Sequence, residues 1–365
     1  MNKETNIIEP YSGLYVHVPF CLSKCPYCDF YSVKYGNAAA KIYGSAVLRN
    51  IFHYNGKFDT VYFGGGTPIL LWKEICSIIE KADIKSGAEI TVEANPSLAK
   101  EDIFKALLKS GVNRISFGIQ SLDNNELKSL GRRHDSSTAL KAVELAHACG
   151  FENISADIML GTEGQTVKSV ISTLEELVKL PLKHISAYML KIEENTPYAK
   201  AKLDLPDEDE VCDIYLNTVD FLGSKGIKQY EISNFAEEGY ACSHNMKYWS
   251  CEEYLGIGPA AHSLYKGKRF FVKRDINAFC ESEVQKTELE DEQPGGAEEY
   301  AMLRLRLSEG LDVKEYEKRG GDGDKITKNV KMLPKKLVSL KNGRISLTAE
   351  GFLASNAVIG AVLNY

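Results

Sequence analysis

The chain has 365 residues, of which 44% are hydrophobic and 26% are charged, and its formal net charge is −6. This composition is globular, and it excludes a disordered chain, a collagen and a membrane bundle. The acidic balance also argues against a protein coated with basic residues for nucleic-acid binding. Residues 1–10 lack the apolar segment of a signal peptide, and no apolar run is long enough to span a bilayer, so we expect a cytoplasmic protein.

Short apolar runs alternate with amphipathic segments over the first 190 residues. Six of the runs are expected to be strands: Leu14–Val18, Thr60–Phe63, Glu89–Glu93, Arg114–Gly118, Asn153–Asp157 and His184–Met189. The segments between them with helical periodicity are Leu70–Ala82, Glu101–Ser110, Ser137–Cys149 and Val167–Leu180. This alternation predicts repeated βαβ units with a parallel sheet. Two further units that would close an eight-unit barrel are not recognisable, so the fold class we predict is α/β, an incomplete (β/α)6 barrel.

The last part of the chain has a different pattern. An acidic stretch over 281–298 ends in Pro294-Gly295-Gly296 and is typical of a linker. Helical patterns over Tyr300–Leu307 and Ile326–Leu340, followed by a short strand at Gly343–Leu347, predict a small helical, winged-helix-like domain. The domain is weakly basic, and we expect it to pack against the barrel or a partner rather than DNA. We divide the chain into a partial barrel (1–235), a middle segment with the linker (236–298) and a C-terminal domain (299–365).

Polar or cysteine-bearing segments follow five of the six predicted strands. These segments contain Cys21, Gly64-Gly65-Gly66-Thr67-Pro68, Glu93, Gln120 and Asp157. In parallel barrels the active site forms where the carboxyl ends of the strands converge. Core packing does not explain polar groups at the same end of successive strands, so we expect a site there. Taken singly, Glu93 or Asp157 is equally well explained as a strand-end cap, and the glycines as a tight turn.

Three of the nine cysteines are crowded together, and without an export signal a disulfide framework is not expected. Cys21, Cys25 and Cys28 form a C-x3-C-x2-C pattern. Three thiolates can ligate three irons of a [4Fe–4S] cluster and leave the fourth iron open. A zinc site, closed by His17 or Asp29 as a fourth ligand, is the alternative.

The cysteine spacing, with the aromatic Tyr27 before the third cysteine, resembles the loop of the radical S-adenosylmethionine superfamily. That resemblance implies that S-adenosylmethionine chelates the open iron and is cleaved to a 5′-deoxyadenosyl radical, which a barrel lumen shields from water. Nearly the whole chain resembles the coproporphyrinogen III dehydrogenase-like branch, and within it the HemW family of heme chaperones.

The resemblance implies ligand contacts for eight more residues. Those implied for S-adenosylmethionine are Tyr15, Gly65, Gly66, Thr67 and Glu93. Gln120, Arg132 and Asp157 match residues that contact a second S-adenosylmethionine in the dehydrogenases.

Two features distinguish the chaperones from the dehydrogenases. Phe30 stands where the dehydrogenases carry a further cysteine, which argues against decarboxylation of coproporphyrinogen III. His244-Asn-Met-Lys-Tyr248-Trp249 resembles the HNxxYW segment of the chaperones, whose histidine is implicated in heme binding. Tyr248 and Trp249 can cover an apolar macrocycle. The alternative for His244 is a structural role, in which it satisfies loop backbone.

The resemblance therefore implies a heme chaperone that holds a [4Fe–4S] cluster, S-adenosylmethionine and heme, and that passes heme to proteins such as cytochromes. We also expect no nucleic-acid partner, with delivery at a membrane face and a homodimer as further hypotheses. Two enzymes are the alternatives. One is an oxidoreductase that decarboxylates coproporphyrinogen III, and the other is a radical enzyme that acts on heme.

Overall fold

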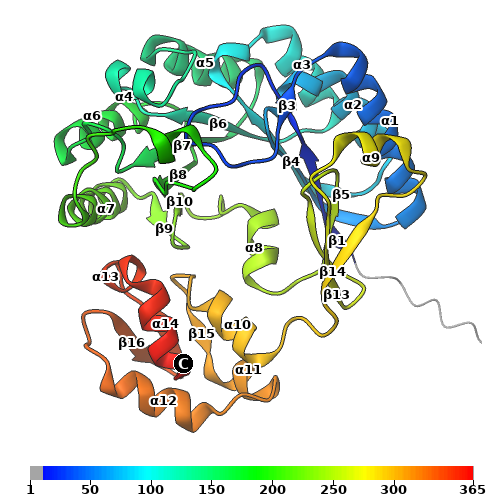
Figure 1. The fold of residues 1–365 in the computed structure, drawn as a ribbon. Coiled ribbons are helices and arrows are strands. Elements are labelled where there is room, and N and C mark those ends of the chain that lie inside the picture. Colours follow the sequence, from blue (N-terminus) through cyan, green and yellow to red (C-terminus); the bar gives the residue numbers. More distant parts are fainter. Residues whose placement is uncertain (1–10, 365) are drawn as a thin grey trace, which may run out of the picture.

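The computed structural model describes residues 11–364, so residues 1–10, for which no signal peptide is expected, lie outside the described residues. The six predicted strands are all present and lie side by side in parallel (Figure 1). They are β1 (Ser12–Val18), β4 (Lys57–Gly65), β5 (Asp83–Ala94), β6 (Arg114–Gln120), β7 (Asn153–Leu160) and β8 (His184–Met189). This arrangement confirms the predicted α/β partial barrel.

Helices cover the outer face of these strands (Figure 1). They are α1 (Asn37–Tyr54), α2 (Trp72–Lys81), α3 (Glu101–Ser110), α4 (Asn124–Ser129), α5 (Ser136–Cys149), α6 (Val167–Leu177) and α7 (Glu208–Ser224). Short 3-10 turns, η1 (Pro68–Leu71), η2 (Pro96–Leu98) and η3 (Pro197–Lys200), begin at prolines. The helix ends follow local rules: the Asp135 side chain caps α5, and Gly111 and Gly150 end α3 and α5 in the left-handed conformation.

The sheet extends beyond the six predicted strands at both edges, to twelve strands in all. Next to β8 lie β10 (Asn234–Ala236) and β9 (Lys228–Gln229), and β11 (Tyr254–Ile257) pairs in parallel with β1. Beyond β11 follow β12 (His262–Tyr265), β13 (Lys268–Val272) and β14 (Thr287–Asp291), all antiparallel. The segment also holds α8 (Ser243–Trp249) and α9 (Ile276–Glu281).

Strand β14 lies inside the acidic stretch that the sequence predicts as a linker. All five of its residues are exposed, so no apolar alternation marks it as a strand. Pairing with β13 and surface ion pairs such as Lys273–Glu288 (2.6 Å) hold it at the sheet edge. The proposed domain boundaries themselves stay a prediction.

The C-terminal part holds helices and a small sheet of order β15-β17-β16. Its elements are α10 (Ala297–Arg304), β15 (Leu311–Asp312), α11 (Val313–Lys318), α12 (Gly323–Met332), β16 (Val338–Lys341), β17 (Arg344–Leu347), α13 (Ala349–Leu353) and α14 (Ser355–Leu363). The helix predicted over Ile326–Leu340 is too long. It ends at Met332 because Pro334 cannot continue it, and the chain then enters β16. Within residues 11–364 no helix is long and apolar enough to cross a membrane.

Candidate functional site

The cysteine loop follows the carboxyl end of β1, and its two ends lie side by side. Strand β2 (Phe20–Cys21) pairs in parallel with β3 (Val33–Lys34) and brings the two ends of the loop together. The Phe20 ring is fully buried and meets the Tyr35 and Tyr43 rings edge-on, which anchors the start of the loop in the core. The start of the cysteine loop is therefore held in a fixed position.

The three thiols of the loop are free and only partly exposed. Thr67 Oγ1 lies 3.6 Å from Cys21 Sγ, and Arg132 Nη1 lies 3.5 Å from Cys25 Sγ. Burial raises the pKa of the Cys28 thiol, and the neighbouring Cys25 and Cys21 sulfurs raise it further. Among the described residues no three His, Cys, Asp or Glu side chains are already arranged to hold a metal ion.

The glycine-rich segment after β4 packs directly against the start of the cysteine loop. A Cβ on Gly66 would lie 2.6 Å from the Phe20 carbonyl oxygen and 2.9 Å from that of Val18, and its N–H donates to the Val18 carbonyl at 2.8 Å. Gly65 has a φ of +110°, and a Cβ there would lie 2.7 Å from the His17 ring. Only glycine fits these contacts, so the two motifs form one unit.

Glu93, at the end of β5, is a half-buried carboxylate beside the glycine segment. Its Oε1 accepts a hydrogen bond from Tyr62 Oη (2.9 Å) and its Oε2 accepts one from the Gly65 N–H (3.1 Å). Burial raises the pKa of Glu93 to about 7, and the nearby Asp157 carboxylate also raises it. The carboxyl group is therefore fixed in place and can change its protonation state near neutral pH.

Gln120 and Arg132 meet over Gly118, where a Cβ would lie 3.0 Å from Gln120 Nε2 and 3.3 Å from Arg132 Nη2. Gln120 is held at a φ of +74°, and its buried Oε1 has no partner. The buried Nε of Arg132 also has none, while its Nη2 donates to the Gly118 carbonyl at 2.5 Å. Unpartnered buried polar atoms are costly, so this pair fits a polar ligand that completes the site.

Asp157 lies on β7 and accepts a hydrogen bond from Ser116 Oγ (3.1 Å). Burial raises its pKa, and the nearby Arg114 and Arg132 guanidinium groups counter that shift. Tyr27 lies beside Arg132 and the cysteine sulfurs, and burial is the main cause that raises its pKa. Asp157 and Tyr27 thus belong to the same site as the cysteine loop.

Tyr15 and His17 form a pair on β1, with 3.0 Å between Tyr15 Oη and His17 Nδ1. The second ring nitrogen of His17 hydrogen-bonds the Tyr31 carbonyl at 3.0 Å. Since both nitrogens are engaged, His17 is not positioned as the fourth ligand of a zinc site. The other zinc candidate, Asp29, lies at the surface with its carboxylate 3.7 Å from Arg274.

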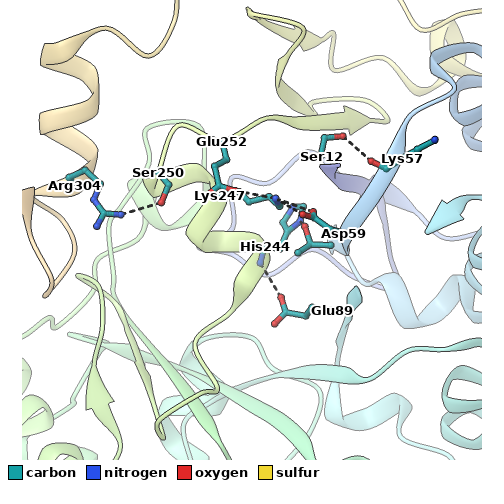
Figure 2. Close-up of polar contacts among 10 residues, drawn as sticks. Ser12, Lys57, Asp59, Glu89, His244, Lys247, Ser250, Glu252 and Arg304 are labelled. Carbon is teal, nitrogen blue, oxygen red and sulfur yellow. Dashed lines mark hydrogen bonds and ion pairs between the residues drawn. The ribbon is translucent and has the colours of Figure 1, made fainter. Parts of the chain in front are cut away.

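His244 lies on α8 (Figure 2), and its ring stacks on those of Tyr15 and Tyr62, with centroids 6.5 Å and 5.5 Å apart. Its ring is fully buried, with Nδ1 2.8 Å from Thr60 Oγ1 and Nε2 2.8 Å from Tyr248 Oη. Burial lowers the pKa of His244 to about 3, so the imidazole is neutral. Both ring nitrogens thus hydrogen-bond hydroxyl groups in this structure. The role of His244 in heme binding stays a prediction.

The site also includes residues that the sequence analysis did not single out. Tyr62 donates to Glu93, and the fully buried Arg114 lies close enough to influence the pKa of both Glu93 and Asp157. Inward alternation on β4, where Thr60, Tyr62 and Gly64 share one face, is the signal that could have identified Tyr62.

The fold and the cysteine loop together define a radical S-adenosylmethionine protein, and residues 15–177 match the Radical SAM superfamily. Residues 296–354 match the HemN C-terminal domain. The structure is similar to that of coproporphyrinogen III oxidase (HemN) from Escherichia coli, described as a radical SAM enzyme. The TM-score is 0.80 over 97% of this chain and 90% of that chain, at 20% identity, and it shows the shared fold.

The chain belongs to the HemW family. It is 32% identical to the heme chaperone HemW of Lactococcus lactis, over 95% of this chain and 96% of that protein. It is 33% identical to the heme chaperone HemW of Escherichia coli, over 84% of this chain and 85% of that protein. These matches confirm the resemblance seen in the sequence, and the family implies a [4Fe–4S] cluster and S-adenosylmethionine.

Proposed function

We propose that this chain is a heme chaperone that holds a [4Fe–4S] cluster and S-adenosylmethionine and passes heme to other proteins. The observation that carries the proposal is the near full-length similarity to heme chaperones, which includes the cysteine loop and the C-terminal part. Phe30 supports the chaperone over a decarboxylase, because it stands where the dehydrogenases carry a further cysteine.

Cys21, Cys25 and Cys28 would hold the cluster in this proposal. The residues that would contact the first S-adenosylmethionine are Tyr15, Tyr27, Gly65, Gly66, Thr67 and Glu93. Those available to a second are Gln120, Arg132 and Asp157. The donor set fits these groups, because three free thiols, a backbone cradle that excludes any Cβ and two unpartnered polar atoms lie in one place. When bound, the cluster would supply the electron for cleavage of the sulfonium.

Heme needs an accessible apolar surface, and the cysteine loop offers one. Leu22 and Phe30 on this loop are 39% and 63% exposed. Contiguous exposed apolar surface is typical of ligand-binding grooves. We propose that the macrocycle contacts the loop there and that His244 is the candidate ligand of its iron.

Heme titration of the cluster-loaded protein tests this proposal. We expect about one heme per chain, and Phe30→Ser should weaken binding about thirtyfold, because burying a phenylalanine side chain contributes about 2 kcal/mol. Phe52 on α1, 59% exposed, is the matched control, and Phe52→Ser should leave the affinity unchanged. Equal losses in both variants, or no saturable binding in the wild type, would refute the proposal.

The proposal also includes a cytoplasmic location, transfer to cytochromes or other heme proteins, delivery at a membrane face where the recipient is membrane-bound, and a homodimer. The net charge of −6 supports the absence of a nucleic-acid partner. Oxidative decarboxylation of coproporphyrinogen III is the second candidate, favoured by the fold shared with HemN.

A further inference from the structure

The segment from α12 into the following turn carries a concentrated positive charge. Between residues 325 and 336 the chain has no aspartate or glutamate and five exposed lysines, namely Lys325, Lys328, Lys331, Lys335 and Lys336. The charge of this segment is opposite to that of the whole chain, whose formal net charge is −6. We call these five side chains together with Met332 the lysine patch.

Helix α12 packs its apolar side inward and leaves the lysines outside. Ile326 and Val330 are only 2% and 4% exposed. Lys325, Lys328 and Met332 have the spacing i, i+3, i+7 on the other side of the helix, where all three are exposed. Figure 1 shows α12 at the end of the C-terminal part that lies away from the barrel. The lysine patch therefore faces solvent.

Carboxylates neutralise little of the charge of the lysine patch. Among the described residues, the ion pairs of the C-terminal part use other basic side chains, which are Arg304, Lys318, Arg319 and Arg344. Asp322 and Asp324 precede the patch, and Asp322 caps α12 by accepting the backbone N–H of Lys325 at 2.8 Å. Five lysines against these two aspartates still leave a net charge of +3 over residues 322–336.

Met332 adds an apolar group to this charged surface. Its side chain is 71% exposed, more than any other large apolar side chain of the described residues. The turn beyond it is held in place, since the Leu337 N–H donates to the Pro334 carbonyl at 2.9 Å and the Thr348 hydroxyl donates to the Lys336 carbonyl. Surface helices bind membranes through lysines that attract anionic headgroups and apolar side chains that enter the acyl boundary. The lysine patch presents both.

We propose that the lysine patch docks the C-terminal part on an anionic lipid surface, with Met332 between the lipid headgroups. The inference deepens the delivery at a membrane face and rests on the proposed function only for that purpose, because the contact itself needs neither heme nor the cluster. A nucleic-acid backbone would also offer phosphates to the lysines, but it has no apolar layer for Met332. A lipid surface suits both features of the patch.

The test is sedimentation of the cluster-loaded full chain with vesicles made of equal parts phosphatidylglycerol and phosphatidylcholine. We expect binding to these vesicles and none to pure phosphatidylcholine. A rise in salt from about 0.1 M to about 0.5 M should release most of the bound protein, because salt screens the contact. The triple variant Lys325→Gln, Lys328→Gln, Lys331→Gln should bind about hundredfold more weakly, since each lysine near an anionic surface contributes roughly fivefold.

Two controls separate this contact from a general effect of charge or of exposed apolar groups. A second triple variant, Lys109→Gln, Lys141→Gln, Lys168→Gln, removes the same charge from exposed lysines on α3, α5 and α6. It should bind within about threefold of the wild type. Met332→Ser should weaken binding about fivefold, whereas Met302→Ser on α10, where the side chain is 39% exposed, should not change it.

Equal losses in the two triple variants, equal binding to both kinds of vesicle, or tighter binding to a DNA duplex than to the anionic vesicles would overturn the inference. Absence of vesicle binding by the wild type would overturn it as well. If the protein binds heme but not the vesicles, the inference alone is removed. If it binds the vesicles but not heme, the proposed function is removed and the membrane contact remains.

Discussion

Alanine in place of Cys21, Cys25 or Cys28 is expected to abolish the iron–sulfur absorption of anaerobically reconstituted protein. Each thiolate is proposed to hold one iron, so one missing ligand leaves two irons open and the cluster is lost. The wild type should hold close to four irons per chain, and each variant close to none. Iron analysis and the visible spectrum measure both quantities.

Cys76 provides the control for that experiment. Its thiol is partly buried on α2, and it points to the Ala106 carbonyl at 3.7 Å. Cys76→Ala should retain the full iron content. Stoichiometric zinc without an iron–sulfur signal, in wild-type protein isolated anaerobically from iron-replete cells, would contradict the assignment of the cluster.

The second large effect is expected at Glu93, in the pH dependence of S-adenosylmethionine binding. Between pH 6 and 8 the affinity of the wild type should rise, because the pKa of Glu93 is raised to about 7 and its ionised form is the stronger hydrogen-bond acceptor. Glu93→Gln should bind about ten- to hundredfold more weakly at pH 8 and lose this dependence. A pH profile identical in both proteins would contradict the proposed role.

Other charged and titratable groups near Glu93 have to be considered in that profile. They come from six elements of the barrel and are Tyr15, Tyr62, Arg114, Asp157, Tyr188 and Tyr248. Burial raises the pKa of each of these tyrosines, so they stay neutral up to pH 8. The Asp157 carboxyl has a raised pKa as well, which makes Asp157→Asn the variant that separates its contribution.

The raised pKa of Glu93 also affects the stability of the ligand-free protein. The pKa of Glu93 is higher in the folded chain than the ordinary value of 4.5. Its contribution to the free energy of unfolding is therefore fully present below pH 4.5 and is lost as the pH rises through about 7. Bound S-adenosylmethionine would offset this loss, so ligand stabilisation should be larger at pH 8 than at pH 6.

The central strands could be predicted because each is a short apolar run followed by polar residues. Helix α1 was missed, since the face it buries mixes the small residues Ala40, Gly44 and Ala46 and the polar Asn50 with larger apolar residues, which gives a weak periodic signal. Strand β14 was missed because it is the edge strand of the sheet and all of its residues are exposed, so it shows no alternation. Periodicity in the sequence therefore predicts the central strands of the sheet but not its edge strand.

The candidate site was predictable to a similar extent. Strand ends and the cysteine spacing identified the residues that the fold brings together at the carboxyl ends of β1 and β4 to β7. The environment of His244 could not be read in this way, because its partner Thr60 lies 184 positions away in the sequence. Periodicity and spacing do not show which side chains a histidine contacts across the fold.

We propose that this radical S-adenosylmethionine protein binds heme and does not decarboxylate coproporphyrinogen III. The most direct test is an anaerobic incubation of cluster-loaded protein with S-adenosylmethionine, a low-potential reductant and coproporphyrinogen III, with chromatographic analysis of the product. A preparation that binds heme saturably should leave the coproporphyrinogen unchanged, since Phe30 stands in place of the further cysteine. Multiple turnovers to the decarboxylated product would contradict the account and establish the second candidate function.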